Sequence, residues 1–340
     1  MMTLWWLLSA AAGVSLALTW VLRRYALARS LIDITNKRSS HDIPTPRGGG
    51  MAIVLAFLGC LPVLWALDLV PVSLLVALSG SGGLVALIGF LDDHYHLARR
   101  WRLFFHVVAA AWALFWLNGM PALMVAQLSL PRGVLSNAIA VVYVVWLLNA
   151  YNFMDGIDGL ASIEAITVCV GGVVMYLITV PGNPQWIVPA MLLASVAGFL
   201  YWNYPPARIF MGDAGSGFLG VTLAVLSIQA AWIAPNLFWA WVIMLGVFVV
   251  DASVTLIRRM LGGGRKYLEA HRSHAYQYAA RRFGAHKPVS LAVGAINLVW
   301  LCPLATVVGL GYLNGMLGLL IAYIPLVGLA VLLKAGADTL

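Results

Sequence analysis

Residues 134–160 read VLSNAIAVVYVVWLLNAYNFMDGIDGL, and this stretch decides the fold. An apolar run close to membrane-crossing length passes directly into a short polar segment with two glycines. Runs of this kind recur along the chain, and in lipid they must be helical because every backbone group needs an internal partner. We therefore predict an all-α polytopic membrane protein with about eleven (10–11) transmembrane helices. The predicted spans lie near 3–22, 50–67, 72–91, 103–119, 134–150, 160–180, 186–202, 217–233, 237–257, 289–310 and 314–334.

The composition excludes two broad classes of protein. Of the 340 residues, 62% are hydrophobic and 9% are charged, and the mean hydropathy is +0.93. A soluble domain carries roughly 25% charged residues, and disordered chains are far less apolar. Cys60, Cys169 and Cys302 all lie in apolar runs, which predicts core thiols rather than a disulfide framework. We expect residues 1–340 to form a single integral membrane domain.

Basic residues are distributed unequally between the two sets of loops. With the N-terminus outside, 19 of the 20 Lys and Arg fall on one side, and only Arg132 falls on the other. The positive-inside rule makes that side cytoplasmic and the N-terminus periplasmic. Topology thus accounts for the net charge of +8, with no need for nucleic acid, and anionic membrane lipids are the expected partner of these loops. The predicted cytoplasmic segments are 23–49, 92–102, 151–159, 203–216, 258–288 and the C-terminal tail.

Acidic residues and histidines gather on the same side. Of the 12 Asp and Glu, only Asp68 falls outside, and all 7 histidines are at or near the cytoplasmic ends of spans. A transporter of a polyprenyl-linked sugar or a nucleotide sugar is the alternative, but it would need polar groups or broken helices near the midplane. The spans read as apolar and uninterrupted. This pattern favours a single catalytic domain that works at the cytoplasmic membrane surface.

The first polar motif is the pair Asp92-Asp93 at the inner end of the third span. Adjacent carboxylates repel each other, and a divalent cation such as Mg2+ relieves that repulsion while binding substrate phosphates. A solvated helix end is the alternative reading. Arg99, Arg100 and Arg102 follow, and they either meet a substrate phosphate or serve only as positive-inside charges.

The second motif follows the fifth span and repeats a polar side chain every three residues. Asn149, Asn152, Asp155 and Asp158 would occupy neighbouring positions on a helix or a helix-to-loop turn. A polar loop with turn glycines is the alternative. The CDP-alcohol phosphotransferases also contain Asp-Gly pairs, but their Ala-Arg after the first pair and their later spaced aspartates are absent here.

Two glycine-rich segments flank other spans. Phe210-Met-Gly-Asp213-Ala-Gly-Ser216 precedes the eighth span and would aim a carboxylate at a metal and backbone amides at a phosphate. Residues 44–50, PTPRGGG, lead into the second span and predict a rigid turn that presents Arg47.

The last motif, His271-Arg272-Ser273-His274, lies in the basic loop 258–288. Three readings are open: a zinc site, which lacks a nearby third ligand; a basic amphipathic helix on the membrane; and binding of a phosphate or diphosphate.

In this order and on one side of the membrane, the motifs resemble those of the polyprenyl-phosphate N-acetylhexosamine-1-phosphate transferases, or glycosyltransferase family 4. The phospho-N-acetylmuramoyl-pentapeptide transferases belong to the same superfamily. The resemblance covers roughly residues 30–290. The sequences of residues 44–50 and 271–277 are most similar to those of the branch that initiates bacterial O-antigen. They depart from the peptidoglycan branch, which has Thr-Met where this chain has Arg47. His96 and Arg100 stand near positions where family members carry lysines.

The resemblance implies that an N-acetylhexosamine 1-phosphate passes from a UDP-sugar (UDP-GlcNAc or a UDP-FucNAc type) to undecaprenyl phosphate, with release of UMP. It also implies a multi-pass protein of the bacterial inner membrane, Mg2+ as the cofactor with Mn2+ as a substitute, and a role in lipopolysaccharide synthesis. A homodimer is left open. The expected catalytic residues are Asp92, Asp93 and Asp155, the expected metal ligands are Asp93, Asn152 and Asp213, and the expected substrate-binding residues are Asn149, Asp158, Phe210, Arg47, Arg100, His271, Arg272 and His274.

Overall fold

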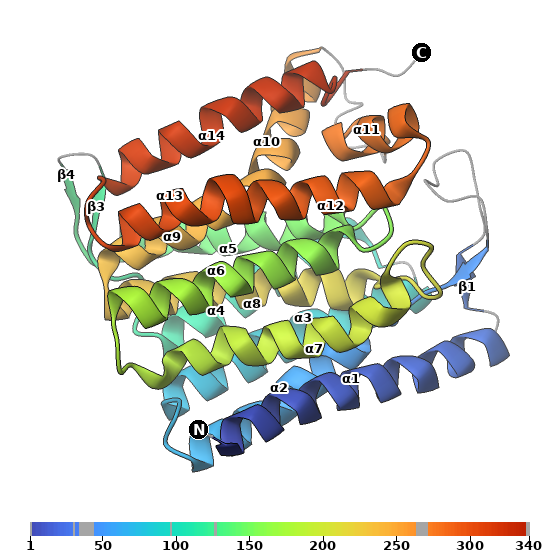
Figure 1. Cartoon of the computed structure of the whole chain (residues 1–340), viewed down its shortest axis with the longest axis horizontal. Helices are drawn as coiled ribbons and strands as arrows, with labels where there is room; N and C mark the ends of the chain where they lie inside the picture. Colours follow the sequence, from blue (N-terminus) through green and yellow to red (C-terminus); the bar gives the residue numbers. More distant parts are fainter. Residues whose placement is uncertain are drawn as a thin grey trace.

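The protein is a bundle of long apolar helices (Figure 1). The computed structural model describes residues 2–29, 31–33, 44–95, 97–125, 128–262 and 271–337. His96 and parts of the predicted loops 23–49 and 258–288 lie outside these residues. The helices are α1 Met2–Ala28, α2 Met51–Ala66, α3 Val72–Tyr95, α4 Arg99–Trp116, α5 Val134–Met154, α6 Leu160–Thr179, α7 Ile187–Asn203, α8 Asp213–Ile233, α9 Pro235–Met244, α10 Gly246–Leu261, α11 Ala275–Phe283, α12 His286–Ile296, α13 Cys302–Gly309 and α14 Gly315–Leu332.

The all-α polytopic fold is confirmed. Within the described residues, eight helices are long and apolar enough to cross a membrane, or nine if the bent pair α9–α10 counts as one span. Helix α2 is shorter, at 16 residues, and α4 begins with a cluster of arginines. Each of the eleven predicted segments nevertheless contains helix, so a count of eleven and the orientation stay predictions.

The expectation of uninterrupted spans was wrong at 237–257. Helices α9 and α10 meet at Leu245 with a bend of 66°. A side chain on Gly246 would place its Cβ 2.8 Å from Tyr323 and 3.1 Å from Leu326, so the bend is packed tightly against α14. A second irregularity, the π-helical turn Asn297–Leu301, joins α12 to α13. The bend at Leu245 contains no proline, so the sequence pattern does not reveal it, whereas Pro303 follows the π-helical turn and cannot donate a backbone hydrogen bond to Val299 within it.

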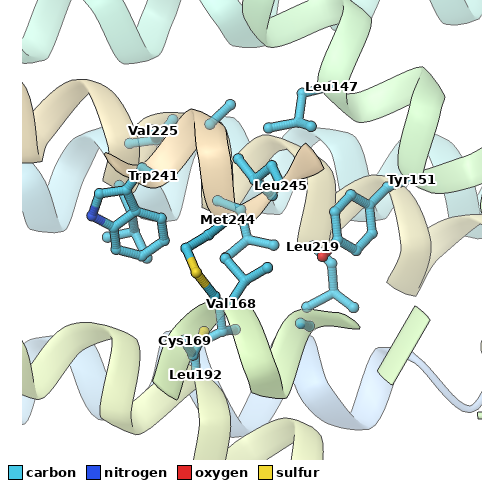
Figure 2. Close-up of a cluster of buried hydrophobic side chains, with 14 of the residues drawn as sticks. Leu147, Tyr151, Val168, Cys169, Leu192, Leu219, Val225, Trp241, Met244 and Leu245 are labelled. Atoms are coloured by element: carbon cyan, nitrogen blue, oxygen red, sulfur yellow. The ribbon is translucent and has the colours of Figure 1, made fainter. Parts of the chain in front are cut away.

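Helix α8 forms the centre of the bundle and packs against α3 and α5. A Cβ on Gly220 would lie 2.6 Å from the backbone of Leu148, so α5 and α8 approach with no room for a side chain. Figure 2 shows part of this core, with Trp241 and Met244 of α9 beside Val168 and Cys169 of α6. Of the three free cysteines, only Cys169 is fully buried.

Two small antiparallel ribbons lie at opposite ends of the bundle. Strand β1 (Ile32–Asp33) pairs with β2 (Thr45–Pro46), and β3 (Leu123–Val125) pairs with β4 (Leu128–Leu130). In Figure 1, β3 and β4 are at the left end, whereas β1, α11 and the last turn of α14 are at the right end. The polar motifs lie at that right end, which we call the site end.

Candidate active site

The site is built around the carboxylate of Asp92, which is buried at the end of α3. Its Oδ1 accepts a hydrogen bond from the backbone N–H of Leu97 at 2.7 Å, and its Oδ2 pairs with Arg102 of α4. Helix α4 begins at Arg99, four residues before the predicted span, so Arg102 faces back across the turn onto α3. Asp92 thus fixes the α3–α4 turn and orients a guanidinium.

Asp213 is the first residue of α8 and lies beside the same guanidinium. The Nη1 atom of Arg102 lies 3.2 Å from its Oδ2. Its Oδ1 accepts a hydrogen bond from Asn152 Nδ2 at 2.9 Å, and the same amide lies 3.2 Å from Ser216 Oγ. The first, second and third polar motifs therefore meet at Asp213, as the sequence predicted. In this arrangement Asn152 donates through Nδ2 and positions Asp213, and its side-chain oxygen can still act as a metal ligand.

Asp93 lies against the N-terminus of α8. Its carbonyl oxygen accepts a bond from Arg47, and Arg47 Nη1 lies 3.9 Å from its Oδ1. The backbone amides of Asp213 and Ala214 act electrostatically on its carboxylate. Its Oδ2 is nevertheless buried and, among the described residues, meets no group in hydrogen-bonding geometry. A buried anionic oxygen without a partner is costly, so this atom is suited to an incoming cation.

The Arg47 turn and the Phe210 segment are backbone partners. Phe210 N–H donates to the carbonyl of Pro46 at 2.8 Å, and Gly49 N–H donates back to the carbonyl of Phe210 at 2.9 Å. A Cβ on Gly50 would lie 2.5 Å from Gly215 Cα. These contacts bring two predicted motifs, separated in the chain by the six helices α2 to α7, together at the site end.

Asp155 and Asp158 follow α5 and differ in their surroundings. Desolvation, with the charges of Asp213 and Asp93 next, raises the pKa of Asp155 to about 8. Asp158 Oδ2 accepts a hydrogen bond from Ala207 N–H at 3.0 Å, and its Oδ1 lies 3.2 Å from His286 Nδ1. Asp158 therefore fastens the loop after α5 to the 203–212 segment and to α12.

The histidine motif is held by an aspartate that the sequence reading did not select. Asp251 of α10 accepts bonds from Ala275 N–H at 3.0 Å and from Tyr276 N–H at 3.1 Å, so it caps the N-terminus of α11. It also lies 3.2 Å from His274 Nδ1. Tyr276 Oη donates to the carbonyl of Phe153 at 3.0 Å, which links the motif to the end of α5.

His271 stacks on His274 with ring centroids 5.0 Å apart. Desolvation, with the neighbouring His274 and Arg259, lowers the pKa of His271 to about 4. Arg272 is half-buried, and its carbonyl accepts a hydrogen bond from Arg281 at 3.1 Å. Of the three readings, the zinc site has no support within the described residues, because no three His, Cys, Asp or Glu side chains converge there to hold a metal.

The same finding applies to the carboxylates, where no three-ligand cage is preformed among the described residues. Mg2+ commonly binds through one or two carboxylates together with waters and substrate phosphates. The unpartnered Oδ2 of Asp93 and the adjacent Asp213 fit that mode of binding. The residues present therefore suit a cation that arrives with a phosphate ligand.

A cavity opens beside the carboxylates and runs between α3, α4, α5 and α8. Its polar end contains Asp92, Arg102, Asn152 and Asp213, and its apolar walls come from the spans. Asn149 also lines it, while donating a hydrogen bond to Val145 of its own helix at 2.7 Å. The remaining lining residues are Val85, Ile88, Gly89, His106, Leu148 and Gly217.

Arg100, expected to bind substrate, does not contact the carboxylates, and that role stays a prediction. It is exposed and lies 6.0 Å from the ring of Trp101, whereas Arg102 contacts the carboxylates. A signal for the contact of Arg102 was present, because Arg102 and His106 are four apart and share one helix face. Asp251 could also have been found, since a lone acid inside an apolar run marks a functional position by default.

The comparisons with known proteins show the family of this chain. The family model of Glycosyl transferase family 4 matches residues 75–231, which include Asp92, Asn152 and Asp213. A probable undecaprenyl-phosphate N-acetylglucosaminyl 1-phosphate transferase of Bacillus subtilis is 30% identical over 252 residues, covering 72% of this chain and 69% of that protein. The chain belongs to glycosyl transferase family 4.

Two other members of the family show how far the similarity extends. A phospho-N-acetylmuramoyl-pentapeptide-transferase of Ruegeria pomeroyi is 32% identical over 270 residues, covering 68% of this chain and 72% of that protein. A decaprenyl-phosphate N-acetylglucosaminephosphotransferase of Mycolicibacterium smegmatis is 27% identical and covers 97% of this chain and 89% of that protein. The family and the helices together show a multi-pass membrane protein of a sugar-phosphate transferase family.

Proposed function

We propose that this protein transfers an N-acetylhexosamine 1-phosphate from a UDP-sugar to undecaprenyl phosphate and releases UMP. The observation that carries the proposal is the meeting of Asp92, Asp213 and Arg102 at the end of a cavity with apolar walls, with the carboxylate of Asp93 close to Asp213. Such a site offers cation-binding carboxylates and a guanidinium to phosphates, and apolar surface to a lipid. The relatives' names favour N-acetylglucosamine as the sugar. A UDP-FucNAc-type donor and a role in initiating O-antigen remain part of the proposal.

The reaction requires one bond to form and one to break. An oxygen of the lipid phosphate attacks the phosphorus that carries the sugar, and the bond from that phosphorus to the bridging oxygen breaks. UMP leaves with the electron pair. A phosphate monoester with a second pKa near 6 is largely dianionic at neutral pH, so a strong general base is not required. Catalysis then consists mainly of positioning and charge neutralisation.

Asp93, Asp213 and the side-chain oxygen of Asn152 would hold Mg2+, or Mn2+ in its place, and the Asn152 amide N–H would keep Asp213 oriented. When bound, the cation supplies charge neutralisation to the diphosphate. Arg102 would contact a phosphate oxygen, and Asp92 would hold Arg102 in place and, through it, orient the lipid phosphate or take its proton.

The remaining site residues would bind the donor. Asp155 and Phe210 lie at the site end near the carboxylates and would contact the nucleotide and its sugar. His271, Arg272 and His274 would contact the diphosphate, and Arg47 would add a positive charge beside Asp93. Asp158 would act indirectly, through the loop it fastens.

In this proposal the site end faces the cytoplasm of a bacterial inner membrane, where UDP-sugars are dissolved and anionic lipids contact the basic loops. The transporter alternative gains one feature from the bend at Leu245. The carboxylates, however, gather at one end rather than at a midplane site. The arrangement therefore favours the enzyme.

The test is UMP release by purified protein. We expect release to require the UDP-sugar, undecaprenyl phosphate and Mg2+ together. Release of one equivalent of UMP without lipid phosphate would replace the direct route with a covalent aspartyl intermediate. No release with any N-acetylhexosamine donor would contradict the proposed function.

A further inference from the structure

The last turn of the chain, residues 333–337, returns to the histidine motif. We call these residues the C-terminal turn. Helix α14 runs from the left of Figure 1 to the site end, so the turn that follows it arrives beside α10 and α11. Ala335 in this turn is fully buried, which shows that the turn is packed into the protein. The family-model match ends at residue 231, far before it.

Three contacts fasten the C-terminal turn. Gly336 N–H donates to the carbonyl of Ser273 at 2.6 Å. Arg258 of α10 donates through Nη1 to the carbonyl of Ala335 at 2.8 Å. Lys334 Nζ lies 5.4 Å from the ring centre of Tyr278 in α11. The turn therefore connects the end of α10 to the segment that precedes α11.

Ser273 lies between the two histidines of the motif. Its hydroxyl is 3.0 Å from His271 Nδ1, and Arg259 Nη1 lies 3.4 Å from the same hydroxyl. Because Gly336 holds the backbone carbonyl of Ser273, it limits how far this residue can move. A shift of Ser273 would therefore affect His271, whose ring its hydroxyl contacts, and His274, which is the next residue in the chain.

Gly336 is required at its position for two reasons. Its φ is +72°, a conformation that disfavours other residues. An added Cβ would also lie 2.8 Å from the carbonyl oxygen of Thr255 and 2.9 Å from Arg258 Cβ. Thr255 donates to Asp251, the residue that caps α11. A substitution at Gly336 would therefore displace the turn from the segment that supports the motif.

We propose that the C-terminal turn is a positioning element for His271 and His274, and through them for the diphosphate of the UDP-sugar. The inference rests on the proposed function, because it assumes that the motif binds the donor. Helix α14 brings the C-terminal turn to the site end. There Arg258 holds the turn through Ala335, and Gly336 holds the backbone of Ser273.

The test compares Gly336→Ala with Gly328→Ala, a matched control on α14 where an added Cβ meets nothing within 4 Å. For Gly336→Ala we expect KM for the UDP-sugar to rise about 10-fold with KM for undecaprenyl phosphate unchanged, and apparent Tm to fall because the added Cβ is strained. Gly328→Ala should match the wild type. Arg258→Ala should raise KM for the UDP-sugar as Gly336→Ala does, and Arg258→Lys should raise it less. An unchanged donor KM in Gly336→Ala, or equal effects of the two glycine variants, would overturn the proposal.

A second readout does not depend on activity. Diethyl pyrocarbonate should modify His271 faster in Gly336→Ala than in the wild type or Gly328→Ala, as measured by peptide mass spectrometry. A faster reaction in a protein that releases no UMP would support the positioning role and refute the proposed function. An unchanged reaction would refute the positioning role, even in an active enzyme.

Discussion

Arg102 Nη1 lies 3.2 Å from Asp213 Oδ2, although 111 positions separate the two residues in the chain. The same guanidinium nitrogen pairs with Asp92, so one cation joins the end of α3, the start of α4 and the start of α8. Asn152 approaches Asp213 from the end of α5. Side chains from four helices thus meet around one carboxylate. The helices themselves pack through the apolar core, so substitutions around Asp213 should affect activity more than stability.

Replacing Arg102 by Lys should lower kcat/KM by about 100-fold, because an ammonium cannot contact two carboxylates and a phosphate in the planar geometry of a guanidinium. Arg100→Lys is the matched control on the same helix and should stay within about twofold of the wild type. Both variants keep the net charge. If Arg100→Lys were the damaging change, the placement of Arg102 in the site would be wrong.

Asp213→Asn should reduce Mg2+-dependent UMP release by at least about 100-fold while the protein remains folded. The amide keeps the shape of the side chain but loses the negative charge that would attract the cation and Arg102. Activity measured against Mg2+ concentration, with apparent Tm as the folding control, checks this expectation. Near-normal activity with normal Mg2+ dependence would refute the assignment of Asp213 as a metal ligand.

Gly89→Ala should disrupt the contact between α3 and α8. An added Cβ would lie 2.5 Å from both the backbone nitrogen of Ala214 and the carbonyl carbon of Asp213, and neither backbone atom can move without shifting the site. We expect a loss of about 1–3 kcal/mol in stability and a larger loss in activity. Gly83→Ala on the same helix, where nothing lies within 4 Å, is the control and should lower neither.

His271 should make the protein sensitive to acid. The pKa of His271 is lowered to about 4, so between its ordinary value of 6.5 and 4 the unfolded chain binds a proton that the folded protein does not. The folded state therefore loses stability as pH falls through this window and is unaffected above it. Apparent Tm should fall less between about pH 7.5 and about pH 5 in His271→Gln than in the wild type. An equal fall in the two proteins would contradict the lowered pKa.

Much of the site could be predicted from the sequence because its residues lie at the ends of apolar runs. Hydropathy locates those ends, and helices that cross in alternate directions must bring every second end together. This places the motifs of Asp92, Asn152 and Asp213 at one end of the bundle, and the resemblance to the family supplied their expected roles. The chain direction also placed Arg47 and Phe210 at the same end of the bundle, where the structure pairs their segments.

The rest depended on helix rotation and on backbone detail that hydropathy does not contain. Which of Arg100 and Arg102 faces α3 depends on how α4 is rotated about its own axis, and packing against α3 sets that rotation. The bend at Leu245 lies next to Gly246, which packs against α14, and no proline in the sequence marks its position. Asp251 meets the histidine motif across 23 positions of the chain, through a capping contact to α11 that a linear pattern cannot reveal.

The most direct test of the account is to follow the β-phosphorus of the donor. Purified protein is supplied with undecaprenyl phosphate, Mg2+ and UDP-N-acetylglucosamine radiolabelled at that phosphorus, and the lipid is extracted. Sugar-1-phosphate transfer predicts that the label enters the lipid fraction in step with UMP release, and that Asp213→Asn abolishes both. Label that stays in the aqueous phase as UDP while sugar appears on the lipid would contradict the account.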